Sequence, residues 1–119
     1  MPTPAWFAAA RFGLFVHWGP YSRHGWEPSW PLVGGIAAFP SCQDMPVATY
    51  YADALRFAPP PGAPREWMRL ARRAGMTYAV LTTKHHDGFT LFPCAARAFG
   101  VAQAGGHDLV AEFVAAARA

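Results

Sequence analysis

Two short apolar segments constrain the fold of this chain most, because each has the length and composition of a buried strand. Each is also closed or followed by histidine. Residues 12–18 read FGLFVHW and are closed by Gly19-Pro20, and residues 77–83 read TYAVLTT and run into Lys84-His85-His86. Almost unbroken apolar runs of this length are typical of strands that are buried on both faces, as in a parallel sheet. We therefore expect two strands of one sheet.

Between the two segments, apolar side chains recur every three or four residues, which predicts helices. The apolar face of a first helix comprises Val47, Tyr50, Tyr51, Ala54 and Leu55. After a Pro-Pro-Pro-Gly break, a second helix begins near Pro64 and ends at Gly75, positions that suit these two residues. Its expected inward side chains are Trp67, Leu70, Ala71 and Ala74, and its outer face carries Arg65, Arg69, Arg72 and Arg73.

A loop over residues 84–106 leads to a third predicted helix, which Asp108 starts at the end where the helix dipole favours a carboxylate. Strands joined by helical crossovers are parallel and right-handed. The 119 residues suit one domain and exclude a multidomain enzyme, whereas a complete (β/α)8 barrel needs about 250 residues. We expect an α/β fold, a partial (β/α)8 TIM barrel with roughly its first two β/α units over residues 1–119, as the beginning of a longer domain.

The carboxyl ends of parallel strands collect functional groups. His17 closes the first predicted strand, and His85 and His86 follow the second. Because neighbouring strands lie about 4.8 Å apart, the three imidazoles can reach one pocket. The spacing therefore predicts a site built on three histidines.

Two kinds of chemistry are open to such a site. One is a zinc or iron centre with Asp87 nearby, although we expect His85 and His86 to chelate poorly, because consecutive side chains on an extended segment point opposite ways. The other is hydrogen bonding to a polyhydroxylated ligand, because each imidazole offers a donor and an acceptor. Aromatic side chains to cover the C–H faces of a sugar would come from Trp18, Trp26, Trp30 and Phe89.

Composition limits the remaining possibilities. The 10 basic residues exceed the 7 acidic ones by only three and form no basic stripe, so we expect no nucleic-acid partner. The apolar runs are strand-sized and no signal peptide is visible, so we expect no membrane segment and leave the compartment open. Cys42 and Cys94 form no CxxC pair and are either singly bridged or, as we expect, two buried thiols.

Four stretches together resemble the α-L-fucosidases of glycoside hydrolase family 29. They are FGLFVHWGPYS at 12–22, WMRLARRAG at 67–75, TKHHDGF at 83–89 and DLVAEF at 108–113, and the similarity runs from Trp6 to Ala119. The resemblance implies a retaining exoglycosidase that releases terminal α-L-fucose on a (β/α)8 barrel. It also implies a fucosylated oligosaccharide or glycoside as partner and no cofactor.

The same resemblance implies which residues bind the sugar. The histidines of the two motifs, here His17, His85 and His86, contact the fucose hydroxyls. The family commonly adds a Glu-Trp pair from the loop after the first strand, where this chain reads WEPSW from Trp26 to Trp30. Either Trp30 takes the aromatic place with Ser29 where Glu is usual, or Trp26 and Glu27 serve in reversed order.

Retaining hydrolysis needs two carboxylates about 5–5.5 Å apart. The chain has seven acidic residues: Glu27, Asp44, Asp53, Glu66, Asp87, Asp108 and Glu112. We expect those on helices to be solvated and Asp87 to orient the histidine loop by bonding its own backbone. In the family the nucleophile and the acid/base come from later strands, so no catalytic residue is expected here. A non-catalytic carbohydrate-binding or degenerate fragment and a histidine-ligated metal-dependent hydrolase remain the alternatives.

Overall fold

A computed structural model of the chain describes residues 2–25 and 46–119. Strands β1 (Gly13–His17) and β2 (Tyr78–Thr82) form a two-stranded parallel sheet. The register pairs Gly13 with Tyr78 at one end and His17 with Thr82 at the other. The predicted parallel α/β arrangement is confirmed over the described residues.

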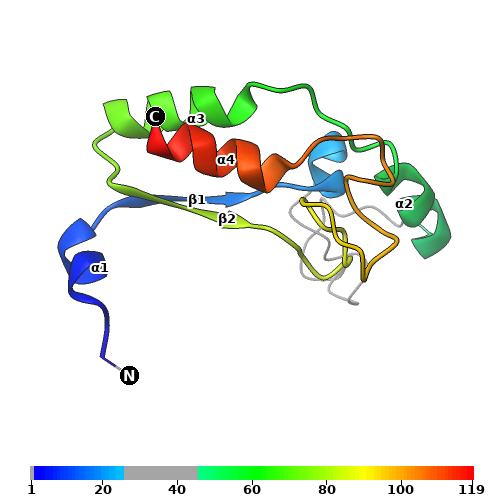
Figure 1. The fold of residues 1–119 in the computed structure, drawn as a ribbon, viewed down its shortest axis with the longest axis horizontal. Coiled ribbons are helices and arrows are strands. Elements are labelled where there is room, and N and C mark those ends of the chain that lie inside the picture. Colours follow the sequence, from blue (N-terminus) through cyan, green and yellow to red (C-terminus); the bar gives the residue numbers. More distant parts are fainter. Residues whose placement is uncertain (1, 26–45) are drawn as a thin grey trace.

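The remaining elements are short helices arranged around this sheet (Figure 1). In chain order they are α1 (Ala5–Ala10), the 3-10 helix η1 (Pro20–His24), α2 (Val47–Ala54), α3 (Ala63–Arg73) and α4 (Leu109–Arg118). Helices α3 and α4 lie side by side on one face of the sheet, α2 lies beyond the carboxyl ends of the strands, and α1 lies at the opposite end. Within the described ranges, none of the helices is both long enough and apolar enough to cross a membrane.

The core lies at the carboxyl end of the sheet and includes the loop after β2. Phe89 and Leu91 are each 1% exposed, and Val101 is fully buried. Backbone hydrogen bonds fix this loop: the Leu91 amide donates to Thr83 O at 3.0 Å and the Leu109 amide donates to Leu91 O at 3.0 Å. The segment between β2 and α4 is therefore a packed structure that can position side chains.

The expected ends of the last two helices are confirmed. Asp108 is the N-cap of α4, with its carboxylate accepting a hydrogen bond from the Ala111 amide at 2.8 Å. Gly75 follows the end of α3 with a φ of 80°, a conformation that glycine adopts without strain. Both signals depend only on local backbone chemistry, which explains why the sequence revealed them.

The expected apolar faces of α2 and α3 are partly wrong. Tyr50 and Ala54 of α2 are buried as expected, but Val47, Tyr51 and Leu55 are exposed. In α3, Ala71 is buried and Trp67 half-buried, whereas Leu70 and Ala74 are exposed. The expectation fails for α2 because this eight-residue helix is buried only along the narrow stripe of Tyr50 and Ala54. It fails for α3 because Leu70 and Ala74 line an apolar groove of about 460 Å³ beside β1.

The first strand also differs from expectation, because it is not buried on both faces. Leu14 and Val16 are half-buried, while Phe15 is 62% exposed and His17 is exposed. Side chains alternate across a strand, so only one face of β1 is covered within the described residues. The other face presents Phe15 and His17 together.

Candidate sugar-binding site

Three imidazoles lie in one contiguous group at the carboxyl ends of the two strands. His17 is the last residue of β1, and its Nδ1 lies 3.0 Å from the Thr82 hydroxyl at the end of β2. The His17 and His85 ring centroids are 5.3 Å apart, and those of His85 and His86 are 4.5 Å apart. The parallel register therefore brings together the three histidines that the spacing predicted to meet.

A tight turn, and not an extended segment, presents His85 and His86. The Gly88 amide donates to His85 O at 3.0 Å, which places His86 and Asp87 at the centre of the turn. Gly88 has a φ of 81°, which a residue with a side chain adopts only with strain. The expectation that His85 and His86 point opposite ways is wrong for this reason: the turn leaves their rings in contact.

Asp87 holds this turn from within. Its carboxylate is buried, with the residue 4% exposed, and Oδ1 accepts a hydrogen bond from the Phe89 amide at 3.0 Å. This confirms the predicted backbone bond. The other oxygen, Oδ2, accepts a hydrogen bond from the Tyr50 hydroxyl at 2.6 Å, a contact that the sequence did not reveal because Tyr50 also fits the apolar face of α2.

A second tyrosine lies against the same histidines. Tyr21 of η1 is 2% exposed, and its ring centroid lies 5.8 Å from that of His85. Its buried hydroxyl has no hydrogen-bond partner among residues 2–25 and 46–119. Burial, and then the nearby Asp87 carboxylate, raise the pKa of Tyr21, so the phenol remains protonated.

The aromatic residues expected to cover a sugar divide into two groups. Trp18 and Phe89 are core residues, 8% and 1% exposed, so this expectation is wrong for them. Trp18 packs against Trp67, with ring centroids 4.8 Å apart. Among the described residues, an exposed aromatic ring next to the histidines belongs to Phe15, whose centroid lies 5.2 Å from that of His17. Its place two residues before His17 on an alternating strand was the signal that could have identified it.

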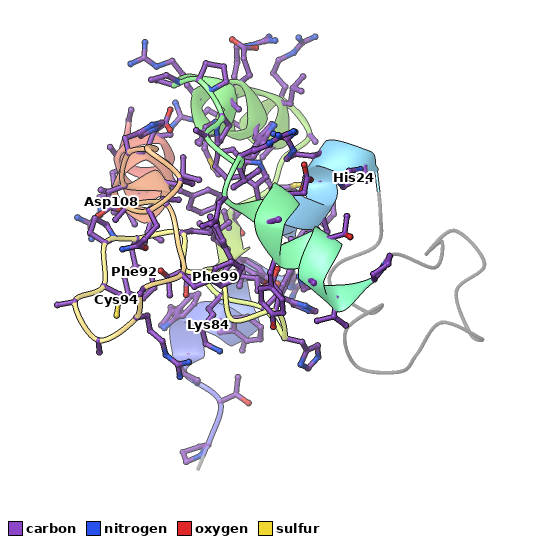
Figure 2. The ribbon with its side chains drawn as sticks, turned by 90° about the vertical axis from the view of Figure 1, so that its right-hand side faces the viewer. His24, Lys84, Phe92, Cys94, Phe99 and Asp108 are labelled. Carbon is purple, nitrogen blue, oxygen red and sulfur yellow. The ribbon has the colours of Figure 1, made fainter. Side chains whose placement is uncertain are left out.

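The other predicted sugar-binding residues, Trp26, Glu27 and Trp30, lie outside the described residues, and so does Cys42. Cys94 is half-buried and lies on the loop after β2, across this end of the molecule from His24 (Figure 2).

The described acidic side chains on helices are engaged in structural contacts. Asp53 lies 2.7 Å from His24 Nε2, and Glu112 lies 2.7 Å from His107 Nε2. Glu66 pairs with Arg69 at 2.9 Å on the exposed side of α3. The Glu112 carboxylate also accepts a hydrogen bond from the Gly62 amide at 2.6 Å. The expectation of simple solvation is therefore wrong for Asp53 and Glu112, which join α2 to η1 and α4 to the start of α3.

The structure offers no support for the metal alternative in the part it describes. Among residues 2–25 and 46–119, no group of three or more His, Cys, Asp or Glu is arranged to hold a metal ion. The three imidazoles instead form a contiguous group of rings, and an imidazole can both donate and accept hydrogen bonds.

His85 is expected to remain neutral at a lower pH than an ordinary histidine. Its burial, and then its neighbours His86 and His17, lower the pKa of His85 below 6.5, with Asp87 opposing them. Because an unfolded chain would take up this proton first, the contribution of neutral His85 to stability is present above pH 6.5 and is lost as the pH falls towards the folded pKa. Titration of the complete protein, followed by 15N NMR of its histidine side chains, should give a midpoint below pH 6.5 for His85. A midpoint at or above 6.5 would contradict this account of the cluster.

Known proteins match this chain closely in sequence. The family model described as Alpha-L-fucosidase matches residues 1–119. Tissue alpha-L-fucosidase of Rattus norvegicus is 41% identical over 130 aligned residues, which cover 98% of this chain and 27% of the relative. The tissue alpha-L-fucosidase of Homo sapiens is 41% identical over 102 residues, covering 77% of this chain and 21% of the relative.

Solved structures agree. Alpha-L-fucosidase isoenzyme 1 from Paenibacillus thiaminolyticus is similar with a TM-score of 0.74 and 38% identity, over 95% of this chain and 25% of that one. The Thermotoga maritima alpha-fucosidase in complex with fucose has a TM-score of 0.71 and 29% identity, over 98% of this chain and 32% of that one. The chain thus spans about a quarter of the length of the curated relatives, 27% in the rat protein. With its whole length matched by the family model, the chain belongs to the alpha-L-fucosidase family.

Proposed function

We propose that this chain is the amino-terminal part, residues 1–119, of a (β/α)8 catalytic domain that hydrolyses terminal α-L-fucose with retention. The observation that carries the proposal is the contiguous group of His17, His85 and His86 at the carboxyl ends of two parallel strands. In (β/α)8 enzymes this end of the barrel carries the active site. Membership of the alpha-L-fucosidase family supports L-fucose as the sugar that is bound.

The apolar surface left uncovered beside β1 supports the proposal of a partial barrel. An apolar groove of about 460 Å³ runs beside this strand and is lined by Leu14, Val16, Trp67, Leu70 and Ala74 among others. Further strands and helices of a barrel would cover such a surface, because exposed apolar patches and unpaired strand edges are unfavourable in a finished domain. The short span relative to the curated relatives, 27% of the rat protein, agrees with this proposal.

In the proposed site the imidazoles bind the sugar hydroxyls. Neutral His85 offers a hydrogen-bond donor at one ring nitrogen and an acceptor at the other, and a sugar hydroxyl can pair with either kind of group. The Thr82 hydroxyl fixes Nδ1 of His17 and leaves its Nε2 to the ligand. The exposed ring of Phe15 offers an apolar wall beside His17. Trp30, or Trp26 with Glu27, would complete the site from the loop after β1.

The reactive carboxylates are proposed to come from polypeptide outside these residues. Asp87, the acid nearest in sequence to the histidines, accepts hydrogen bonds from Phe89 and Tyr50 and is buried, which suits orientation of the turn. The chain is therefore assigned substrate binding within the reaction, and its substrate is a fucosylated oligosaccharide or glycoside.

Hydrolysis of 4-nitrophenyl α-L-fucoside by the complete protein tests this function. We expect release of nitrophenol with α-L-fucose as the first-formed anomer in a 1H NMR time course. Fucose binding without hydrolysis would identify a carbohydrate-binding protein instead. Activity lost with a bound metal on chelation, and restored by zinc or iron, would favour the metal-dependent hydrolase.

A further inference from the structure

The turn that presents His85 and His86 is fastened to a distant part of the chain. Two of its hydrogen bonds are local, from the Gly88 amide to His85 O and from the Phe89 amide to Asp87 Oδ1, both 3.0 Å long. A third comes from α2, where the hydroxyl of Tyr50 donates to Asp87 Oδ2 at 2.6 Å. The local bonds shape the turn, and the bond from α2 fixes where the turn lies.

Both partners of this bond are buried. Tyr50 is 2% exposed and Asp87 is 4% exposed. A buried carboxylate is costly unless donors satisfy it, so the short bond from the phenol is a strong constraint on the turn. Ala54, one helical turn after Tyr50, is fully buried in the same core, so two residues of α2 pack in the core and hold the helix in place.

The hydroxyl of Tyr50 remains a hydrogen-bond donor to a higher pH than an ordinary tyrosine, because its pKa is raised. Burial raises the pKa of Tyr50 first, and the hydrogen bond to the Asp87 carboxylate and its charge raise it further. The phenol therefore stays protonated, and the bond does not depend on pH between neutrality and mild alkalinity.

We propose that Tyr50 is a positioning residue for sugar binding, which holds His85 and His86 in place relative to His17 through Asp87. Tyr50 is not assigned a contact with the ligand. The ring of His85 is in contact with both other imidazoles, because its centroid lies 5.3 Å from that of His17 on β1 and 4.5 Å from that of His86 on the same turn. A small shift of the turn therefore changes the distances of both imidazoles from His17.

The inference rests on the proposed fucosidase function and is tested in the complete protein with Tyr50→Phe. This substitution removes the donor and keeps the ring. We expect the inhibition constant of L-fucose and the KM for 4-nitrophenyl α-L-fucoside to rise about tenfold, because the turn is then no longer held in the position that binds the sugar, with a smaller change in kcat. Tyr51→Phe is the matched control, because Tyr51 is the next residue on α2 and is 38% exposed. It should change both constants less than twofold.

A double-mutant cycle separates positioning from general stability. If Tyr50 acts through the turn, Tyr50→Phe should weaken fucose binding threefold or less when His85 and His86 are already alanine. A purely structural effect would persist at its full size in that background. Asp87→Asn is a second variant of nearly the same volume, which removes the negative charge and puts an NH2 group in place of one of the two acceptor oxygens, and it should also weaken fucose binding about tenfold.

The outcomes separate the two hypotheses. If the unmodified complete protein neither hydrolyses the fucoside nor binds L-fucose, the proposed function itself fails. If it does both, but folded Tyr50→Phe or folded Asp87→Asn binds L-fucose within twofold of the unmodified protein, only the positioning role is overturned. Failure of both variants to fold would also overturn it, because the hydrogen bond would then be required for the fold as a whole and not for the position of the turn.

Discussion

Replacing His17 with alanine in the complete protein is expected to raise the inhibition constant of L-fucose ten- to a hundredfold. The imidazole lies at the end of β1 with Nδ1 held at 3.0 Å by the Thr82 hydroxyl, so its other nitrogen is preorganised to bond a sugar hydroxyl. Loss of such a bond costs about 1–3 kcal/mol, since the hydroxyl loses its partner. Inhibition of fucoside hydrolysis by L-fucose gives the constant directly.

The control for this prediction is His107→Ala. His107 is paired with Glu112 beside α4, at 2.7 Å, and has no assigned place in the sugar site. It should change the inhibition constant less than twofold, whatever its effect on the thermal midpoint. A folded His17→Ala variant with an unchanged inhibition constant would remove His17 from the site.

The isolated 119-residue chain is expected to show no fucosidase activity and to aggregate or remain partly unfolded. Its described surface exposes Trp6 (63%), Phe12 (50%), Phe15 (62%) and Leu70 (53%), and each strand of the two-stranded sheet has one edge unpaired by any described residue. Apolar surface and free strand edges promote association between chains. The nucleophile and the acid/base are also proposed to come from polypeptide outside these residues.

Three measurements on the purified chain check this prediction together. Size-exclusion chromatography with light scattering gives the mass, near-ultraviolet circular dichroism reports fixed aromatic packing, and release of nitrophenol from the aryl fucoside reports turnover. The complete protein, measured in parallel, should be active and folded. Turnover by a monomeric, folded preparation of residues 1–119 would contradict the proposed division of the site.

The sequence predicted the parts of the fold that depend on local pattern. Both strands, the three longer helices, the cap at Asp108 and the stop at Gly75 all follow from periodicity or from the backbone preferences of single residues. The meeting of His17 with His85 also followed, because parallel strands have a fixed spacing and bring their carboxyl ends to one edge.

The missed features depend on contacts between distant segments. Helix α1 has only six residues, too few to show a helical period, and is recognisable through its Phe7 packing on Tyr78, with ring centroids 5.3 Å apart. The bond from Tyr50 to Asp87 joins residues 37 apart in the sequence. A tyrosine on an apolar helix face gives no sign of its hydrogen-bond partner until the packing is known.

The expected roles of individual aromatic residues failed for a related reason. Trp18 follows His17 directly in the sequence, yet alternation along the strand directs it into the core against Trp67 and leaves Phe15 beside His17. Proximity in sequence is thus a poor guide to which ring can contact a sugar. A better guide is whether two residues are an even number of positions apart on a strand, because such residues share one face.

A crystal structure of the complete protein with L-fucose bound tests the central claim most directly. The account predicts one fucose at the carboxyl ends of β1 and β2, with His17, His85 and His86 each within hydrogen-bond distance of its hydroxyl groups. A fucose bound elsewhere, or one contacted by none of these three imidazoles, would contradict it.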